Sequence, residues 1–449
     1  MFLMCGAKKE KCVQGVVPVD RQPLVCARAL RVLSEPGPLV KYSQKVGGDP
    51  YDPDNNPKGY IDLGLAENRL CEELTTQKLR SLNLSREDES SLQYYPNLKG
   101  LTSFREILAD FLDARFLPRK KINPEELVVA SGTTAILDTL AFCLADPGDY
   151  FMVPAPYYYR IRNDFEDRAR VKVLEVPLSP KAGFELTVKS FEIVYTVAKK
   201  QGKNIRGLLL INPNNPLGDV YTAHFLIEVL HFAFKNGLHV ISDEIYALSV
   251  FDKNSRFRSI LSLPFPDPER VHFLWGVSKD MGLSGYRCGV LHTCNKHVLQ
   301  FATAVGIFHV TPPLMQRRLQ HILADDDWLD TIYFPTLHKR LSVMYKAGCA
   351  KLSEMGVYVH PAKAGIFIWA DFSPFLSEHT FAAEQELFIK FLEARIYVLP
   401  GKQSYCPYPG WFRIVFASNQ HKVMEGLKRM EKVLKNLPSE KERATGKLD

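Results

Sequence analysis

The sequence predicts an α/β protein with a large three-layer domain, in which helices cover both faces of a mostly parallel sheet, and a smaller α+β C-terminal domain. The first observation is that short runs rich in Val, Ile and Leu alternate with segments of helical periodicity. Such fully apolar runs are typical of parallel strands that are buried on both faces. The strand-like runs cover residues 126–131, 150–154, 171–177, 207–212, 238–244 and 271–276, and helical spacing covers 136–145 and 225–237.

The second observation is the length of 449 residues, which favours two domains. The pattern changes after residue 325, where a long helical stretch leads into short strands at 357–361, 365–372 and 412–417 and two more helices. We expect parts of the N-terminal segment to join this small domain. The predicted division is an irregular N-terminal arm (1–58), a large domain (59–325), a small C-terminal domain (326–437) and a polar tail (438–449).

Composition excludes several functional classes. The hydrophobic fraction of 46% and the charged fraction of 24% are typical of a soluble globular protein. The net charge of +7 is spread along the chain, and its densest cluster, residues 119–121, has no interleaved aromatics, so we expect no nucleic-acid partner. No apolar stretch is long enough to span a bilayer. The nine cysteines form no repeating framework, which favours reduced thiols and a cytoplasmic location.

His292, Cys294 and His297 are side chains of metal-ligand type that lie close together in the sequence. A structural zinc site normally needs four such ligands, often arranged as two pairs. No second pair stands nearby in the sequence, so we predict no metal site here.

Lys279 is the residue most indicative of chemistry. It follows the strand-like run 271–276 among small residues, and Arg287 lies eight residues further on. An ordinary lysine amine has a pKa of about 10.4 and is a poor nucleophile near neutral pH. Beside another cation in a semi-enclosed site it loses its proton more easily and can attack an aldehyde. The segment therefore indicates a lysine that forms a Schiff base.

Two further motifs follow predicted strands. Residues 131–134 (SGTT) open a helix, whose N-terminus suits a phosphate, although plain capping by Ser or Thr explains the same letters. Tyr157 follows a proline-rich turn at the carboxyl end of a strand, the edge at which ligands bind in open α/β sheets. It could stack on a flat ring or be an ordinary half-buried tyrosine.

Polar residues in later motifs have similar alternatives. Asn215 lies in the turn 212–218, where it could donate to a ring oxygen or serve a structural turn. Asp243 ends a strand, and a buried carboxylate needs a partner such as a pyridinium N–H, unless it is a helix N-cap. Tyr246 could donate to a phenolic oxygen. Arg413 lies beside aromatics and could bind a carboxylate in a two-pronged geometry or pack structurally.

The order of these motifs resembles the fold-type-I pyridoxal phosphate enzymes of the aminotransferase superfamily. The chain is more closely similar to 1-aminocyclopropane-1-carboxylate synthase and its vertebrate synthase-like relatives. The resemblance spans residues 58–435. Its blocks are IDLGLAEN, FCLADPGD, INPNNPLG, SDEIYA, SKDMGLSGYRCG and PGWFR.

This resemblance implies the chemistry around the cofactor ring. Lys279 forms the Schiff base with pyridoxal phosphate and later acts as the general base. Asp243 binds the pyridine nitrogen, Asn215 and Tyr246 reach the phenolic oxygen, and Tyr157 stacks on the ring.

The same resemblance implies the outer contacts. Thr133, Thr134 and Arg287 hold the phosphate, and Arg413 holds the α-carboxylate of the substrate. Glu67, in GLAEN, matches a glutamate near the substrate, with a surface or capping carboxylate as the alternative.

Two residues depart from the family pattern. Gly276 stands three positions before the lysine, where relatives usually carry a hydroxyl that donates to the phosphate. Losing a hydrogen bond to a charged group costs about 1.5–3 kcal/mol, or roughly tenfold to a hundredfold in affinity. Leu98 stands where plant synthases have a tyrosine that reaches the neighbouring subunit's site, and Tyr94 and Tyr95 lie at shifted positions.

The sequence therefore predicts a homodimeric pyridoxal-phosphate-dependent enzyme that acts on α-amino acids. Leu98 favours transaminase or lyase chemistry over efficient cyclisation of S-adenosylmethionine. The alternative is a protein that binds the cofactor with little turnover and serves as a scaffold or interaction partner.

Overall fold

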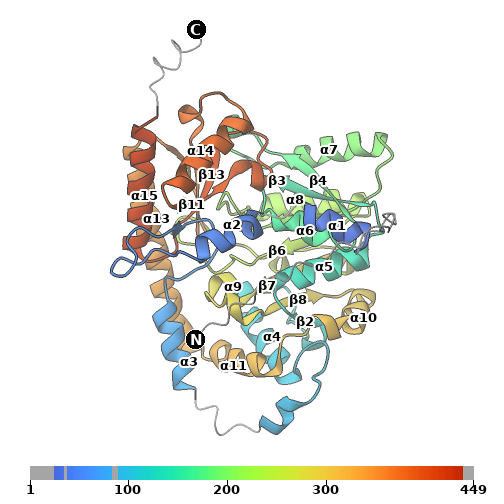
Figure 1. The fold of residues 1–449 in the computed structure, drawn as a ribbon. Helices are drawn as coiled ribbons and strands as arrows, with labels where there is room; N and C mark the ends of the chain where they lie inside the picture. Colours follow the sequence, from blue (N-terminus) through green and yellow to red (C-terminus); the bar gives the residue numbers. More distant parts are fainter. Residues whose placement is uncertain (1–24, 35–37, 83–88, 438–449) are drawn as a thin grey trace, which may run out of the picture.

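The structure is a computed structural model that describes residues 25–34, 38–82 and 89–437 (Figure 1). Its centre is a seven-stranded sheet with the order β2-β8-β7-β6-β5-β3-β4. Strands β7, β6, β5, β3 and β4 run parallel to one another, whereas β8 runs antiparallel to both β7 and β2. The mostly parallel sheet is thus confirmed, and β8 is the strand that the sequence pattern missed. The bounds are β2 (Leu127–Ala130), β3 (Tyr150–Ala155), β4 (Lys172–Pro177), β5 (Ile205–Ile211), β6 (His239–Asp243), β7 (Val271–Gly276) and β8 (Gly289–Thr293).

Helices cover both faces of this sheet. Successive strand residues point to opposite sides, and in these strands both sets of side chains are largely buried. Val128, Val153 and Leu209 belong to one buried cluster, with α5, α6 and α10. Val129 and Leu208 belong to the other, with α4, α7 and α8. The three-layer prediction is therefore confirmed. The helices are α4 (Thr102–Phe116), α5 (Thr133–Leu144), α6 (Arg160–Glu166), α7 (Val188–Lys200), α8 (Ala223–Lys235) and α10 (Lys296–Ala304).

The C-terminal region forms a second, smaller unit. Its sheet has the order β12-β13-β10-β9, and all its pairs are antiparallel. Each short strand predicted here is present, so the expected smaller α+β unit is confirmed. Its elements are α13 (Phe334–Glu354), β9 (Tyr358–His360), β10 (Phe367–Asp371), α14 (Phe381–Glu393), β11 (Ile396–Tyr397), β12 (Leu399–Pro400), β13 (Trp411–Val415) and α15 (Gln420–Lys435).

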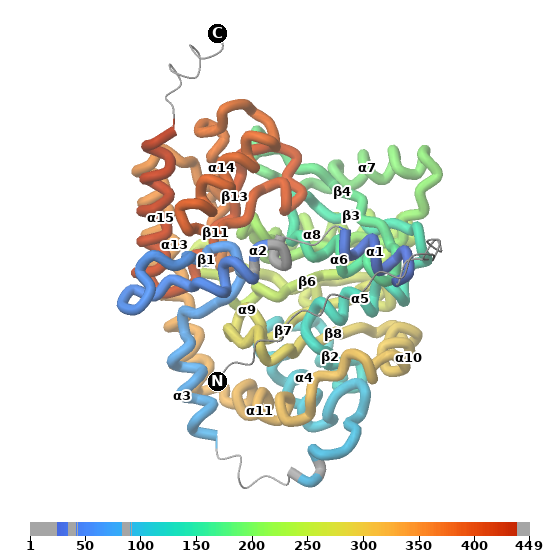
Figure 2. Tube along the Cα trace, in the orientation of Figure 1, coloured from blue at the N-terminus to red at the C-terminus, as the bar shows by residue number. Residues whose placement is uncertain are grey.

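The N-terminal segment differs from the irregular arm that we predicted. It contains α1 (Ala27–Ser34) and α2 (Pro38–Gly47). Ala, Arg and Leu favour the helix in α1, and Leu, Lys and Gln favour it in α2. Strand β1 (Ile61–Asp62) pairs with β11, so the chain beyond residue 59 first joins the small unit (Figure 2). Residues 1–24 and the polar tail lie outside the described residues.

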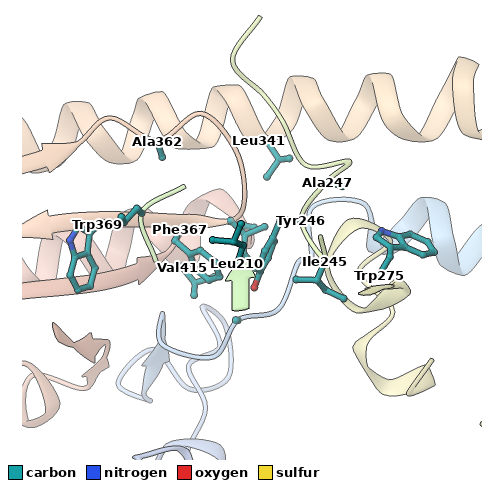
Figure 3. Close-up of a cluster of buried hydrophobic side chains, with 14 of the residues drawn as sticks. Leu210, Ile245, Tyr246, Ala247, Trp275, Leu341, Ala362, Phe367, Trp369 and Val415 are labelled. Atoms are coloured by element: carbon teal, nitrogen blue, oxygen red, sulfur yellow. The ribbon is translucent and has the colours of Figure 1, made fainter. Parts of the chain in front are cut away.

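The hydrophobic core is continuous between the two units. Figure 3 shows Leu210 and Tyr246, from the large sheet region, beside Phe367 and Val415 of the small sheet. The ring of Tyr246 meets that of Phe367 edge-on at 5.3 Å between centroids. This shared core brings residues of both units to one site.

The remaining helices are short. Among the described residues, none of the helices combines the length and the apolar character that crossing a bilayer requires. These short helices are α3 (Glu72–Ser81), α9 (Val277–Asp280), α11 (Pro313–Leu323) and α12 (Asp326–Trp328).

Candidate active site

A cavity of about 140 Å³ lies where β5, β6 and β7 end. This carboxyl edge of a parallel sheet is where α/β folds bind ligands. The cavity gathers most of the predicted site residues from segments far apart in the chain. Those that line it are Thr133, Thr134, Asn215, Asp243, Tyr246, Lys279 and Arg287.

Lys279 lies in α9, directly after β7, and its Nζ donates to the carbonyl oxygen of Ala66 at 2.5 Å. Burial and the nearby Arg413 guanidinium lower the pKa of the Lys279 amine to about 8. A lysine with this pKa is neutral far more often at physiological pH than an exposed one. Lys279 is therefore prepared to act as a nucleophile and as a base.

Asp243 is the last residue of β6, and its Oδ1 accepts from the backbone N–H of Ile245 at 3.2 Å. Burial raises the pKa of this carboxyl to about 7, although Lys279 acts in the opposite direction. A cationic N–H placed against Asp243 would stabilise its ionised form. The cavity thus has an anionic partner for a protonated ring nitrogen.

An anion-binding corner lies at the start of α5. Gly132 has a φ of 85°, and Thr133 and Thr134, the first residues of the helix, line the cavity. The first backbone N–H groups of a helix have no partner within the helix and can bind an anion. Arg287 donates to the carbonyl oxygens of Ser131 at 3.2 Å and Ser284 at 3.1 Å. A Cβ on Gly132 would lie 2.7 Å from Arg287 Nη2, so the glycine permits this close approach. The corner suits a phosphate.

Arg413 lies in the middle of β13 and is 1% exposed. It donates to Asn215 Oδ1 at 3.2 Å and to the carbonyl oxygen of Gly64 at 2.6 Å, and its guanidinium lies 4.6 Å from the Phe367 ring centroid. Its buried Nε has no partner within the described part of the chain. Arg413 does not line the cavity itself but reaches it through Asn215. A carboxylate in this place would pair the buried cation.

Tyr157, which we expected to stack on the cofactor ring, does not line the cavity. Its side chain is fully buried, its hydroxyl donates to Glu175 at 3.3 Å, and its ring stacks on that of Tyr405 at 4.7 Å. The next residue, Tyr158, lines the cavity instead. In the run of three tyrosines after β3, the sequence does not reveal which ring faces the ligand, because the tertiary packing of the preceding turn decides it.

Glu67 lies beside the cavity and does not line it. Its carboxylate accepts from Arg69 Nη2 at 2.6 Å and Nε at 3.0 Å, and its side chain is 31% exposed. The adjacent Ala66 carbonyl is the one that accepts from Lys279. Through its charge, Glu67 opposes the lowering of the Lys279 pKa.

Gly276 and Leu98, the two residues that depart from the family pattern, both lie in close contact with other backbone segments. A Cβ on Gly276 would lie 2.8 Å from the carbonyl oxygen of Cys288 and 3.1 Å from Gly289 Cα, so this close strand contact has no room for a hydroxyl side chain. Leu98 does not line the site cavity; its backbone packs against Gly306. Tyr94 and Tyr95 are 74% and 90% exposed.

The sequence motifs did not identify three further residues that line or support the cavity. Ser278 and Ser284 also line the cavity, and both lie within the quoted block around Lys279, so the motif itself contained the signal. Asp280 is buried behind the site, where it accepts from Ser249 Oγ at 2.5 Å, Trp275 Nε1 at 2.9 Å and Leu248 N at 3.0 Å. Only the tertiary structure reveals this last arrangement.

Comparison with known proteins places the chain in a family. Residues 58–430 match the family described as aminotransferase class I and II. The 1-aminocyclopropane-1-carboxylate synthase-like protein 1 of Mus musculus is 37% identical over 393 residues, covering 86% of this chain and 78% of the relative. The probable inactive 1-aminocyclopropane-1-carboxylate synthase-like protein 2 of Homo sapiens is also 37% identical over 393 residues, covering 86% and 69%. The crystal structure of an aromatic aminotransferase from Pyrococcus horikoshii aligns with a TM-score of 0.71 and 26% identity, covering 84% of this chain and 96% of the other.

Pyridoxal phosphate is the cofactor of this family, and the groups in the cavity fit it. The start of α5 and Arg287 suit its phosphate, the Asp243 carboxylate suits its ring nitrogen, and the Lys279 amine suits its aldehyde. Tyr158 gives the cavity an aromatic wall. Fold, site and family match agree, and the chain belongs to the aminotransferase class I and II family of fold-type-I, pyridoxal-phosphate-binding proteins.

Proposed function

We propose that this protein is a pyridoxal-phosphate-dependent enzyme that acts on α-amino acids by transaminase or lyase chemistry. One observation carries the proposal: a single cavity contains Lys279 and Asp243, and Asn215 links it to the buried Arg413. An amine, a carboxylate and a guanidinium in this arrangement match the aldehyde, the ring nitrogen and the substrate carboxylate.

Arg413 is proposed to bind the α-carboxylate of the substrate. Its hydrogen bonds to Asn215 and Gly64 fix the guanidinium, while Nε keeps an unused donor. A fixed cation in a buried site binds a carboxylate with little loss of side-chain entropy. This contact orients the α-carbon of the substrate towards Lys279.

Lys279 is proposed to move the proton. Asp243 would keep the ring nitrogen of bound pyridoxal phosphate protonated, and the cofactor would then supply an electron sink for the α-carbon of the amino acid. Lys279 Nζ takes the proton from the α-carbon and returns it to the product, as a base whose pKa lies near working pH does best.

Cyclisation of S-adenosylmethionine is the less favoured reaction. Leu98 offers no polar donor, and it lies with Gly306 and His309 around a small apolar cavity separate from the one that contains Lys279. The core residues serve transamination and elimination equally well.

We further propose that the protein is a cytoplasmic homodimer with the two sites near the interface. Ile307 and Phe308 are 50% and 76% exposed. The carbonyl oxygen of the next residue, His309, accepts a hydrogen bond from the backbone N–H of Ser131, which lies in the anion-binding corner. Exposed apolar side chains this close to a site favour an interface there. The cysteines that the structure describes are free thiols, in keeping with a reducing compartment.

A protein that binds the cofactor with little turnover remains the second candidate. Two observations favour it: Gly276 excludes the hydroxyl that relatives place near the phosphate, and the human relative is named as probably inactive. A search for turnover separates the two candidates.

The test is the absorption spectrum of the purified protein with pyridoxal phosphate, recorded before and after adding S-adenosylmethionine and then a panel of amino acids. We expect a cofactor band that shifts with at least one α-amino acid, together with a keto acid or elimination product. A stable band that ignores every compound favours the low-turnover binder.

Lys279→Ala is the decisive variant. We expect it to lose at least about a thousandfold in turnover, since proton transfer by a positioned group contributes roughly 10²–10⁴-fold and the covalent link is lost as well. Lys199→Ala, at an exposed position of α7, is the matched control and keeps full activity. Undiminished turnover in Lys279→Ala would refute the proposed mechanism.

A further inference from the structure

A cluster of three metal-ligand side chains lies at the end of the sheet opposite to the cofactor cavity. His292 is in β8, Cys294 follows that strand by one residue, and Glu126 directly precedes β2. Strands β2 and β8 are neighbours, with Leu127 paired to His292, so residues far apart in sequence meet here (Figure 1). Their ligand atoms all lie within 4.8 Å of one another.

The separations within the cluster are those of a tetrahedral metal site. His292 Nε2 lies 3.4 Å from Glu126 Oε2, and Cys294 Sγ lies 3.8 Å from the same oxygen. Tetrahedral zinc, with bonds of about 2.0–2.1 Å to nitrogen and oxygen and about 2.3 Å to sulfur, sets its N···O pairs about 3.4 Å and its S···O pairs about 3.6 Å apart. An ion could therefore enter with small side-chain movements.

The local geometry holds the ligands in place. His292 and Cys294 are two residues apart along an extended segment, so both project to the same side, and Thr293 between them points the other way. Thr293 is fully buried and hydrogen-bonds His272 Nδ1 at 2.9 Å. This buried contact fixes the segment between the two ligands.

An ion can reach the cluster from solvent. The side chains of His292 and Glu126 are 13% and 33% exposed, so the site is shielded but not closed. The sequence places His297 near His292 and Cys294, and by itself it predicts no metal site at these three residues. The structure leaves His297 out of the cluster and supplies Glu126 instead.

We propose that Glu126, His292 and Cys294 bind one divalent transition-metal ion, of which Zn²⁺ fits the mixed nitrogen, oxygen and sulfur ligands best. Water completes the fourth position. The site does not rest on the proposed function, because β8 separates it from the cofactor cavity: Gly289, at one end of the strand, packs against the start of α5, and Thr293 ends the other.

The test is a titration of Zn²⁺ into the full-length, cofactor-loaded protein in competition with a chromophoric chelator. We expect one Zn²⁺ per chain, and at least a tenfold weaker affinity in each of Glu126→Gln, His292→Gln and Cys294→Ser. With Co²⁺ as a second probe, we expect the visible bands of tetrahedral cobalt in the unaltered protein and their loss in Cys294→Ser.

Two matched controls separate the site from adventitious binding. His297→Gln removes the neighbouring, exposed histidine, and Cys143→Ser removes a half-buried cysteine of α5; both should bind Zn²⁺ as the unaltered protein does. The absorption band of bound pyridoxal phosphate reports that each variant is folded. The proposal is wrong if no Zn²⁺ binds, or if the three ligand variants bind it as tightly as the controls.

Discussion

Gly276 illustrates how packing around one residue decides which chemical groups a site can contain. The sequence suggested that a hydroxyl had simply been lost. The structure adds that the carbonyl oxygen of Cys288 and the Cα of Gly289 occupy the space that a side chain would need. Ser278 and Ser284 line the cavity that contains Lys279, and they offer hydroxyl groups from other positions. The departure is thus part of a close strand contact.

Gly276→Ser is the corresponding prediction. Overpacking a closely packed position typically costs about 1–3 kcal/mol, so we expect the unfolding free energy to fall by this amount, without tighter cofactor binding. Urea unfolding measures the first quantity and titration with pyridoxal phosphate the second. Gly47→Ser, where no atom lies within 4 Å of the added Cβ, should change stability by less than about 0.5 kcal/mol. A serine that improves affinity at unchanged stability would contradict the steric explanation.

At the same scale, the tyrosines after β3 show where sequence reasoning stops. The motif correctly placed an aromatic at the sheet edge, but it selected Tyr157, whose ring lies against Tyr405. Tyr158 lines the cavity. Tyr405 comes from a segment about 250 residues later, and contacts of that range are not visible in a local pattern.

At the scale of elements, Asp280 connects three segments that build the site. Its carboxylate accepts from Trp275 in β7 and from Leu248 and Ser249, which follow the Tyr246 turn, while Asp280 itself ends α9. The helix that carries Lys279 is thereby fixed to the segment that carries Tyr246. Asp280 is a positioning residue, since it lies behind the cavity.

Asp280→Ala tests this connection. The buried donors of Ser249 and Trp275 would lose their acceptor, as would the half-buried Leu248 N–H. Because each unsatisfied buried group costs about 1–3 kcal/mol, we expect a loss of at least about 2 kcal/mol in unfolding free energy. Asp280→Asn should recover most of it, because the Ser249 hydroxyl can accept as well as donate. Urea unfolding is the measurement, and Asp54→Ala at an exposed position is the control. Equal stability of the Ala and Asn variants would argue against the hydrogen-bonded connection.

At the scale of the whole molecule, the site depends on contact between the two units. Arg413 comes from the small sheet and Asn215 from the turn after β5, and they are hydrogen-bonded to each other. The continuous core around Tyr246 and Phe367 holds them there (Figure 3). Motion of one unit against the other would therefore change the contact between Arg413 and Asn215, on which the proposed binding of the substrate carboxylate depends.

The proposed homodimer is tested at this same scale. We expect the protein to sediment as a dimer at micromolar concentration, and Phe308→Asp to weaken the dimer at least tenfold, because a charge would be buried in an apolar contact. Ile193→Asp, at a 55% exposed position of α7, is the control for an added surface charge and should remain dimeric. A protein that sediments as a monomer while fully active would contradict the proposal.

The sequence by itself determined the α/β architecture and six of the seven strands of the large sheet, and it singled out Lys279, Asp243 and Arg413 as candidate site residues. These follow from local signals: apolar runs of strand length, helix periodicity, and polar residues placed at strand ends. Tertiary structure alone decided that β1 pairs with β11, that Tyr158 lines the cavity, that Gly276 has no room for a side chain, and that Glu126 meets His292 and Cys294. Each of these depends on contacts between residues distant in sequence, whose geometry local patterns do not contain.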